Sequence, residues 1–366
     1  MKPGIPRATV RAWLAGASVL ALAGAGAHAA NRSQYHIAHE VNLPGDDGWD
    51  YLTFEEGGHR LFIAHGSQVQ VLDTEHLTLA GNIPDTPGVH GVALAPDVGH
   101  GYVSAGRANT IVVFDLKTLA RLKEIKATGE NPDAIIYDPS THRVFSFNGR
   151  GRNATVIDTH TDEVVGTIAL DAKPEFAVAD GSGHVFVNLE DKNSLAAIDA
   201  QRLSVTSVWP LAGCEEPSAL AIDTAGKRLF AGCGNKVMAV VDATSGRLLG
   251  TAPIGDGVDA AKYDHGARLA FASCGGGDGV LTAVATNAAG VPEVAQSLTT
   301  QRGARTMALD ERTHRIFLAT ASFGAAPPAT AEHPHPRPAI LPGTFRVLVI
   351  EPTGMAMNPA SGEDHP

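Results

Sequence analysis

The chain has 366 residues, of which 44% are hydrophobic and 18% charged, and 39 acidic against 28 basic side chains give it a formal net charge of −11. This acidity argues against nucleic acid as a partner, because affinity for a phosphate backbone comes mainly from Lys and Arg displacing counterions. It argues equally against docking on anionic lipid.

Residues 1–30 predict a cleaved secretory signal peptide. Lys2, Arg7 and Arg11 precede an apolar run over residues 13–27, and Ala27-His28-Ala29 fits a small-x-small cleavage site. No later stretch is long and apolar enough to cross a bilayer, so we expect no transmembrane span. We therefore expect a mature protein exported to the periplasm, with one domain over residues 31–352 and a flexible tail over residues 353–366.

A sequence unit then recurs seven times along the chain. Each unit has a short apolar strand, a turn with Asp or Gly, a second strand ending in Phe or Tyr, and a Val/Ile-rich strand closing on Asp. The equivalent start positions are Asp50, His90, Asp133, Glu175, Ser218, Asp259 and Arg305. A period of about 40 residues with four strands per unit is typical of propeller blades. The sequence thus predicts an all-β fold, a single seven-bladed β-propeller.

The middle strands of the units are apolar throughout, as in residues 61–64, 111–114 and 238–241. Such strands are covered on both faces, as expected between neighbouring blades. The seventh unit supplies only three strands, at residues 305–309, 315–318 and 345–350, whereas a spare strand at residues 35–43 precedes the first unit. Since an open sheet edge promotes aggregation, we expect the N-terminal strand to complete the last blade and close the ring.

The repeats resemble the YVTN-type β-propeller family, and the chain over roughly residues 35–352 looks like a YncE-like protein. The resemblance lies in residues 131–134, 156–159 with 164–168, and 239–246. It implies a propeller fold and a periplasmic or surface location. It says little about activity, because propellers carry many unrelated functions.

The start positions of the seven units should lie on one face of the propeller, around the central channel, and we call them the rim positions. Six of the seven are charged or histidine, and the loops after the second strands add more charge on the same face. Crowded carboxylates raise one another's pKa unless a cation joins them. We therefore predict that a small molecule, peptide or protein binds here, at Asp50, His65, His90, Asp133, Arg150, Glu175, Glu190, Asp259 and Arg305. The alternative is a hydrated channel whose charges pair across the ring, for instance Asp259 with Arg305.

Two further functions use the same residues. Asp50, His65 and His90 form the best metal-like group, because imidazole and carboxylate ligands suit Zn²⁺ or Fe²⁺. A lactonase-like hydrolase would use His90 or His65 as general base and Arg150 or Arg305 to hold an oxyanion. No Gly-x-Ser-x-Gly element marks a nucleophile, so we expect a binding protein rather than an enzyme. The sequence implies no particular cofactor.

The remaining features are structural in our interpretation. His59, His100, His142, His184 and His314 recur in turns on the opposite face, as parts of the repeat. Of three cysteines, we expect Cys214 and Cys233 to form a disulfide in an oxidising compartment, leaving Cys274 free; three reduced, buried thiols are the alternative. A Pro-rich insertion over residues 324–342, with His333 and His335, should form a flap on the rim face. Trp49 and Tyr51 either stack on a ligand or pack between blades.

Overall fold

The computed structural model describes residues 1, 4, 34–328 and 338–354. Nearly all of the predicted signal peptide, the middle of the Pro-rich insertion with His333 and His335, and residues 355–366 lie outside the described residues.

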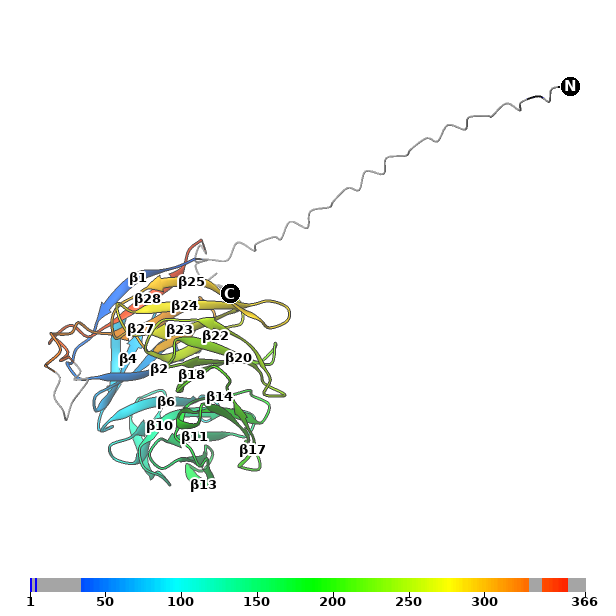
Figure 1. Ribbon diagram of the computed structural model, residues 1–366. Helices are drawn as coiled ribbons and strands as arrows, with labels where there is room; N and C mark the ends of the chain where they lie inside the picture. Colours follow the sequence, from blue (N-terminus) through cyan, green and yellow to red (C-terminus); the bar gives the residue numbers. More distant parts are fainter. Residues whose placement is uncertain (2–3, 5–33, 329–337, 355–366) are drawn as a thin grey trace, which may run out of the picture. The chain divides into compact units, whose positions relative to one another are not determined.

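Six blades are four-stranded antiparallel sheets built from consecutive strands, and Figure 1 labels many of these strands. In chain order the first three comprise β2 (Trp49–Glu55), β3 (Arg60–His65), β4 (Gln68–Asp73), β5 (Thr78–Ile83); β6 (Val89–Ala95), β7 (His100–Ala105), β8 (Thr110–Asp115), β9 (Arg121–Lys126); β10 (Pro132–Asp138), β11 (Arg143–Asn148), β12 (Asn153–Asp158), β13 (Glu163–Ala169).

The next three comprise β14 (Pro174–Ala179), β15 (His184–Leu189), β16 (Ser194–Asp199), β17 (Ser204–Pro210); β18 (Pro217–Asp223), β19 (Arg228–Cys233), β20 (Val237–Asp242), β21 (Leu248–Pro253); β22 (Val258–Asp264), β23 (Leu269–Cys274), β24 (Val280–Thr286), β25 (Pro292–Thr299). The described residues contain a single short helix, the 3₁₀ turn η1 (Glu190–Lys192).

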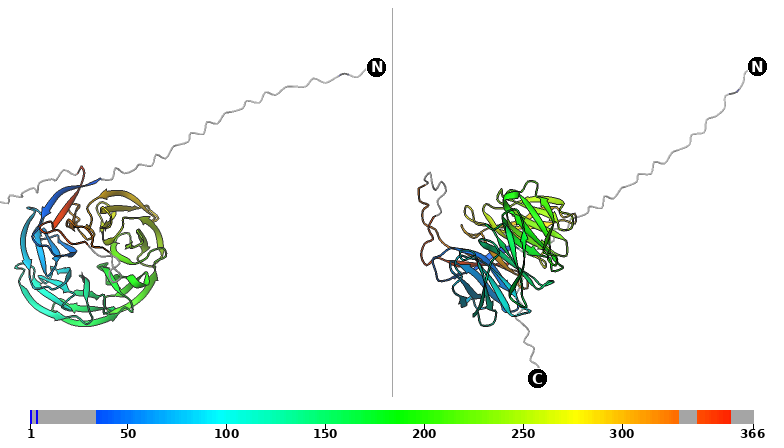
Figure 2. Two further views of the ribbon diagram at one scale, coloured as in Figure 1. Left: turned by 60° about the vertical axis from the view of Figure 1, so that its left-hand side comes forward. Right: turned by 90° about the horizontal axis from the view of Figure 1, so that it is seen from below.

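The seventh blade joins the two ends of the domain, as the sequence predicts. It contains β26 (Met307–Asp310), β27 (Arg315–Thr320) and β28 (Arg346–Pro352), and its outermost strand is β1 (Tyr35–Asn42). β1 pairs antiparallel with β28 from Tyr35 opposite Pro352 to Asn42 opposite Arg346. The left view of Figure 2 shows the ring, with the blue β1 running beside the red end of the chain. The confirmed fold is an all-β, seven-bladed propeller closed by its N-terminal strand.

The core lies between the blades, because each sheet packs both faces against its neighbours. In every blade the aromatic residue on which the repeats align is the third residue of the second strand and is at most 3% exposed. These residues are Phe62, Tyr102, Phe145, Phe186, Phe230, Phe271 and Phe317. The expectation that the second strand ends in this aromatic is therefore wrong: the strand continues for three more residues toward the rim face.

The closing strand is also tied to the blade beside it. The Tyr35 ring is 4% exposed and contacts Phe271 of β23 edge-on, with ring centroids 5.0 Å apart. The side-chain amide of Gln296 in β25 accepts a hydrogen bond from the Tyr35 backbone N–H and donates one to its carbonyl, each at 2.8 Å. Closure thus depends on contacts with two blades.

We expect Tyr35→Ala to lower the free energy of unfolding by about 3 kcal/mol, since it removes a buried aromatic ring from the closing strand. Urea denaturation measures this loss. Val165→Ala on the exposed strand β13 is the control and should change stability by less than about 0.5 kcal/mol. Equal effects of the two substitutions would contradict a closure that depends on Tyr35.

Candidate functional site: the rim of the central channel

The rim side chains are aimed by a bulge that recurs around the ring. In six blades the rim residue is the second residue of the innermost strand, directly after a buried residue that pairs with the end of the second strand. The pairing register of that strand shifts at this point in each of the six. A β-bulge frees residues from the ladder and redirects their side chains. Here it turns the rim residues toward the channel.

Side chains of neighbouring blades hold this bulged backbone in place. Ser104, the fifth residue of β7, donates a hydrogen bond to the carbonyl of Asp133 in the next blade at 2.6 Å. At the equivalent position of β15, Asn188 donates to the carbonyl of Ala219 at 2.9 Å. Ser273 in β23 donates in the same way to the carbonyl of Arg305. These buried donors fix the backbone beneath the rim charges.

The densest part of the rim joins three blades. His90 Nδ1 lies 2.6 Å from Asp50 Oδ2, to which it donates a hydrogen bond, and 3.6 Å from Asp133 Oδ1. One ligand atom from each of Asp50, His90 and Asp133 lies within 4.8 Å of the other two. The three side chains are 16–26% exposed, so they remain open to the channel mouth.

Two further groups complete the rim. Arg305 Nε donates to Asp259 Oδ2 at 2.7 Å, and its Nη2 donates to the carbonyl of Trp49 at 2.8 Å. Lys173 Nζ lies 2.6 Å from Glu175 Oε1 and also pairs with Glu190 in η1. The ion pair between Asp259 and Arg305 is the example given above for a hydrated channel whose charges pair across the ring. Five carboxylates nevertheless face only three basic groups, so pairing leaves negative charge in excess.

This excess appears in the pKa values. Burial raises the pKa of Asp133, and the negative charges of Asp50 and Asp259 raise it further. The positive charge of His90 opposes this shift. Burial and the Asp133 charge raise the pKa of Glu175 to about 8, although Lys173 opposes the shift. Burial alone would lower the pKa of His90, but its hydrogen bond with Asp50 and the Asp133 charge raise that pKa to about 9. The carboxylates resist ionisation and His90 stays protonated at neutral pH.

The predicted place of His65 is wrong. His65 is 2% exposed, its ring stacks on Phe345 with centroids 4.0 Å apart, and its Nε2 contacts the carbonyl of Asp47 at 2.9 Å. Gly45, with φ of +104°, packs directly against this ring, where an added Cβ would lie 2.6 Å from His65 Cε1. His65 belongs to the core between two blades. It ends β3, which lies next to the innermost strand β2 and is one strand farther from the channel. The predicted group of Asp50, His65 and His90 is therefore replaced by Asp50, His90 and Asp133.

Other predicted residues also take structural positions. Arg150 is exposed on the turn between β11 and β12 and, within the described part of the chain, makes no hydrogen bond or ion pair with the rim. Trp49 is 4% exposed and packs on Phe345 and Phe323, which is the inter-blade alternative. The five turn histidines lie near carboxylates on the opposite face, as in His314 with Asp264 at 2.7 Å.

A disulfide lies beside the rim. The structure joins Cys214, in the loop before β18, to Cys233 at the end of β19, with an S–S distance of 2.03 Å and a Cα–Cα distance of 5.4 Å. Cys274 is free and buried. The bond ties the loop that carries Glu215 and Glu216 to its own blade.

Sequence reasoning missed Lys173 and, deeper in the channel, Phe176. Lys173 directly precedes the innermost strand, two residues before Glu175, and the two side chains meet on the channel side. Below the rim, Tyr51 and Phe176 come from blades on different sides of the ring and meet with centroids 5.0 Å apart.

Comparison with known proteins shows the fold and not the family. No protein-family model matches the chain, and no curated protein matches it in sequence. Among solved structures, one named "Crystal structure of RRP9 WD40 repeats" matches with a TM-score of 0.72 and 11% identity, over 87% of this chain and 100% of that one. "Structure of U3-55K" matches at 0.69 and 10%, over 85% and 98%.

A chain in "Crystal Structure of Mitotic Checkpoint Complex" matches with a TM-score of 0.70 and 12% identity, over 96% of this chain and 99% of that one. At such low identity the likeness concerns architecture alone. This chain is thus similar to WD40 β-propellers in fold, whereas the YVTN and YncE-like resemblance stays a prediction. Among the described residues, no helix is long and apolar enough to span a membrane.

The raised pKa of Glu175 predicts a pH-dependent stability. A carboxyl group with a higher pKa in the folded than in the unfolded chain stabilises the fold fully below about pH 4.5, and this contribution is lost as the pH rises toward 8. His90 acts in the same direction up to about pH 9.

Between pH 5 and pH 8 the wild type should therefore lose stability relative to Glu175→Gln by on the order of 1 kcal/mol or more. Denaturation of both proteins at several pH values measures the difference. Glu163→Gln, whose side chain is 69% exposed in the wild type, should parallel the wild type. If the Glu175→Gln and wild-type curves are also parallel, Glu175 does not carry a raised pKa.

Proposed function

We propose that this chain is an exported binding protein whose rim takes a positively charged group of a small molecule, peptide or partner protein. The observation that carries the proposal is the excess of carboxylates at the channel mouth, held by recurring bulges and only partly neutralised by His90, Lys173 and Arg305. Residues of six blades contribute, so a single cationic group at the centre would contact several carboxylates at once.

The charge balance makes a cation the complementary ligand. Asp133 and Glu175 have raised pKa values because burial and neighbouring negative charge disfavour their ionised forms. A bound ammonium or guanidinium group would relieve that repulsion and lower both pKa values. Binding would then release protons. The acidity of the whole chain supports a cationic rather than a nucleic-acid partner.

The proposal places the protein in the periplasm. The apolar run over residues 13–27 behind basic residues and the Ala27-His28-Ala29 site support secretion into the periplasm. The disulfide between Cys214 and Cys233 suits an oxidising compartment. The YncE-like resemblance of the repeats agrees with this location.

The geometry does not favour the hydrolase alternative. A general base must be unprotonated to accept a proton, whereas His90, with a pKa of about 9, is protonated at neutral pH. His65, the other proposed base, is buried against Phe345.

The binding proposal predicts that the rim recognises a cationic probe. Isothermal titration with a tri-arginine peptide at low salt should show binding to the wild type, and Asp133→Asn combined with Glu175→Gln should weaken it by about tenfold or more. Proton release, obtained from titrations in buffers of different ionisation enthalpy, should accompany wild-type binding.

The matched control for this experiment is Asp199→Asn combined with Glu163→Gln, which removes two carboxylates away from the rim. Its affinity should equal that of the wild type. Thermal unfolding checks that both variants fold. Equal affinity of the rim variant and the wild type would reject the rim as the binding site.

A metal ion is the second candidate ligand, favoured by the convergence of Asp50, His90 and Asp133 within 4.8 Å. One imidazole and two carboxylates suit Zn²⁺, Mn²⁺ or Fe²⁺. To coordinate through Nδ1, His90 would give up its proton and its hydrogen bond to Asp50.

Elemental analysis of untagged protein after incubation with Zn²⁺ and desalting decides between a metal and an organic cation. The metal candidate predicts about one ion per chain in the wild type and none with His90→Gln. Tagged protein is unsuitable because the tag itself binds metal. Equal zinc in the two proteins, or sub-stoichiometric zinc in the wild type, would reject this site.

A further inference from the structure

A cavity opens at the end of the channel opposite the rim. It has a volume of about 580 Å³, within the usual range for small-molecule sites, and it reaches the face that carries the turns between first and second strands. Tyr51 and Phe176 contribute to its lining, but none of the rim charges does. The aromatic pair therefore separates an acidic rim from a mainly apolar pocket.

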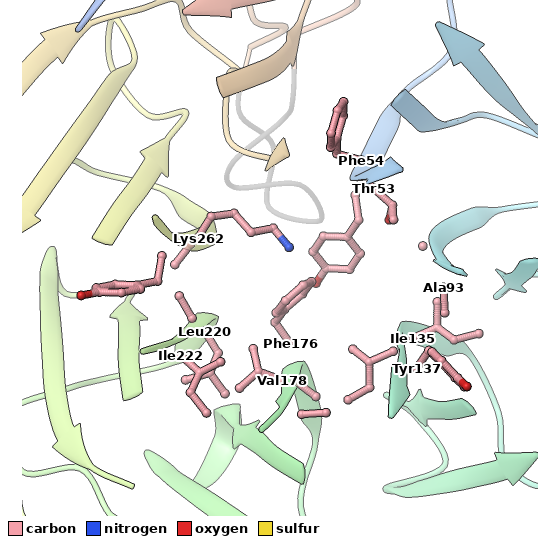
Figure 3. A pocket seen from close by; sticks show the side chains of 18 of the residues that line it. Thr53, Phe54, Ala93, Ile135, Tyr137, Phe176, Val178, Leu220, Ile222 and Lys262 are labelled. Carbon is pink, nitrogen blue, oxygen red and sulfur yellow. The ribbon is translucent and has the colours of Figure 1, made fainter. Parts of the chain in front are cut away.

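One cation extends into this pocket. Lys262 lies in the middle of the innermost strand β22, and Figure 3 shows its ammonium end pointing into the cavity toward Phe176. Nζ lies 5.1 Å from the Phe176 ring centroid. Within the described part of the chain, the Lys262 ammonium makes no hydrogen bond and has no carboxylate within 4.0 Å.

The polar groups around Lys262 are already engaged elsewhere. Glu311 accepts from His265 Nδ1 at 2.9 Å, Asp180 accepts from Ser182 and His184, and the Tyr137 hydroxyl donates to Asp97. The lining also includes the apolar side chains of Ile135, Val178, Leu220 and Ile222. A charged amine held this way costs stability unless an anion joins it, and its pKa is lowered by burial to about 8, with only the Glu311 charge opposing the shift.

We propose that this pocket is a binding site for small amphipathic monocarboxylates, whose carboxylate pairs with Lys262 while the hydrocarbon body lies against the apolar wall around Phe176. The ligand supplies the counter-charge that the chain does not. Its apolar part covers surface that water otherwise contacts, which adds affinity in proportion to the buried area. The site is independent of the rim, and the inference does not rest on the proposed rim function.

The proposal is tested with octanoate and its neutral counterpart 1-octanol, which share one hydrocarbon chain and differ in charge. Isothermal titration of the wild type should give about tenfold or tighter binding for octanoate than for 1-octanol. Lys262→Met keeps the length of the side chain and removes the charge, so it should abolish this preference. The exposed Lys117→Met is the matched control and should retain it.

Two further measurements separate a ligand site from a structural lysine. Lys262→Met should unfold at the same or a higher temperature than the wild type, because it removes an unpaired, partly buried charge. In the wild type, octanoate should slow the acylation of Lys262 by an amine-reactive ester, followed by mass spectrometry of its peptide. This second measurement needs no variant.

The outcomes are distinct. Retained preference for octanoate in Lys262→Met, no octanoate binding by the wild type up to about 1 mM, or unchanged acylation of Lys262 would each overturn the proposal. Asp133→Asn, a rim variant, should bind octanoate like the wild type. If the rim fails to bind tri-arginine while octanoate binding persists, only the rim proposal falls.

Discussion

The antiparallel pairing of β1 with β28 is the interaction on which the other features of this protein depend. Without it the last blade would end in an open sheet edge at β28, and no strand from the N-terminal end of the domain would join the blade that contains β26. The contacts of Tyr35 with Phe271 and Gln296 extend the closure to the preceding blade. Because the ring is closed, the inner strands of all seven blades converge on one channel.

Because the inner strands converge, charged residues that are far apart in the sequence lie close enough to shift one another's pKa values. Asp50 and Asp259 are distant in the sequence, yet both influence the pKa of Asp133. Six blades contribute a bulge with its rim residue and the seventh contributes Arg305, so the ring gathers charges that are far apart in the sequence. Partial pairing by Lys173 and Arg305 keeps the cluster stable enough to fold while leaving negative charge at its centre.

The channel has two chemically different ends. The Tyr51–Phe176 contact crosses it, with acidic groups on one side and a largely apolar cavity on the other. A cationic group suits the rim, and an amphipathic anion suits the pocket that holds Lys262. Both sites occupy places where the repeat departs from the apolar pattern that packing alone would favour, and such departures are expected at functional positions.

The sequence by itself determined the architecture. The period of about 40 residues, the apolar middle strands and the spare strand at residues 35–43 specify seven blades and their closure, because these patterns follow from local strand chemistry and from burial on both faces. It also indicated the rim, since equivalent repeat positions must lie on one face.

Only the tertiary structure decided which side chains meet. His65 and His90 are both predicted to lie on the rim face, but the end of a second strand lies between blades whereas the bulge of a first strand faces the channel. Lys173 reaches Glu175 and Glu190 through the fold of one loop and η1. Contacts across a ring depend on the angle at which each blade is set, and the spacing of residues within a repeat carries no information about that angle.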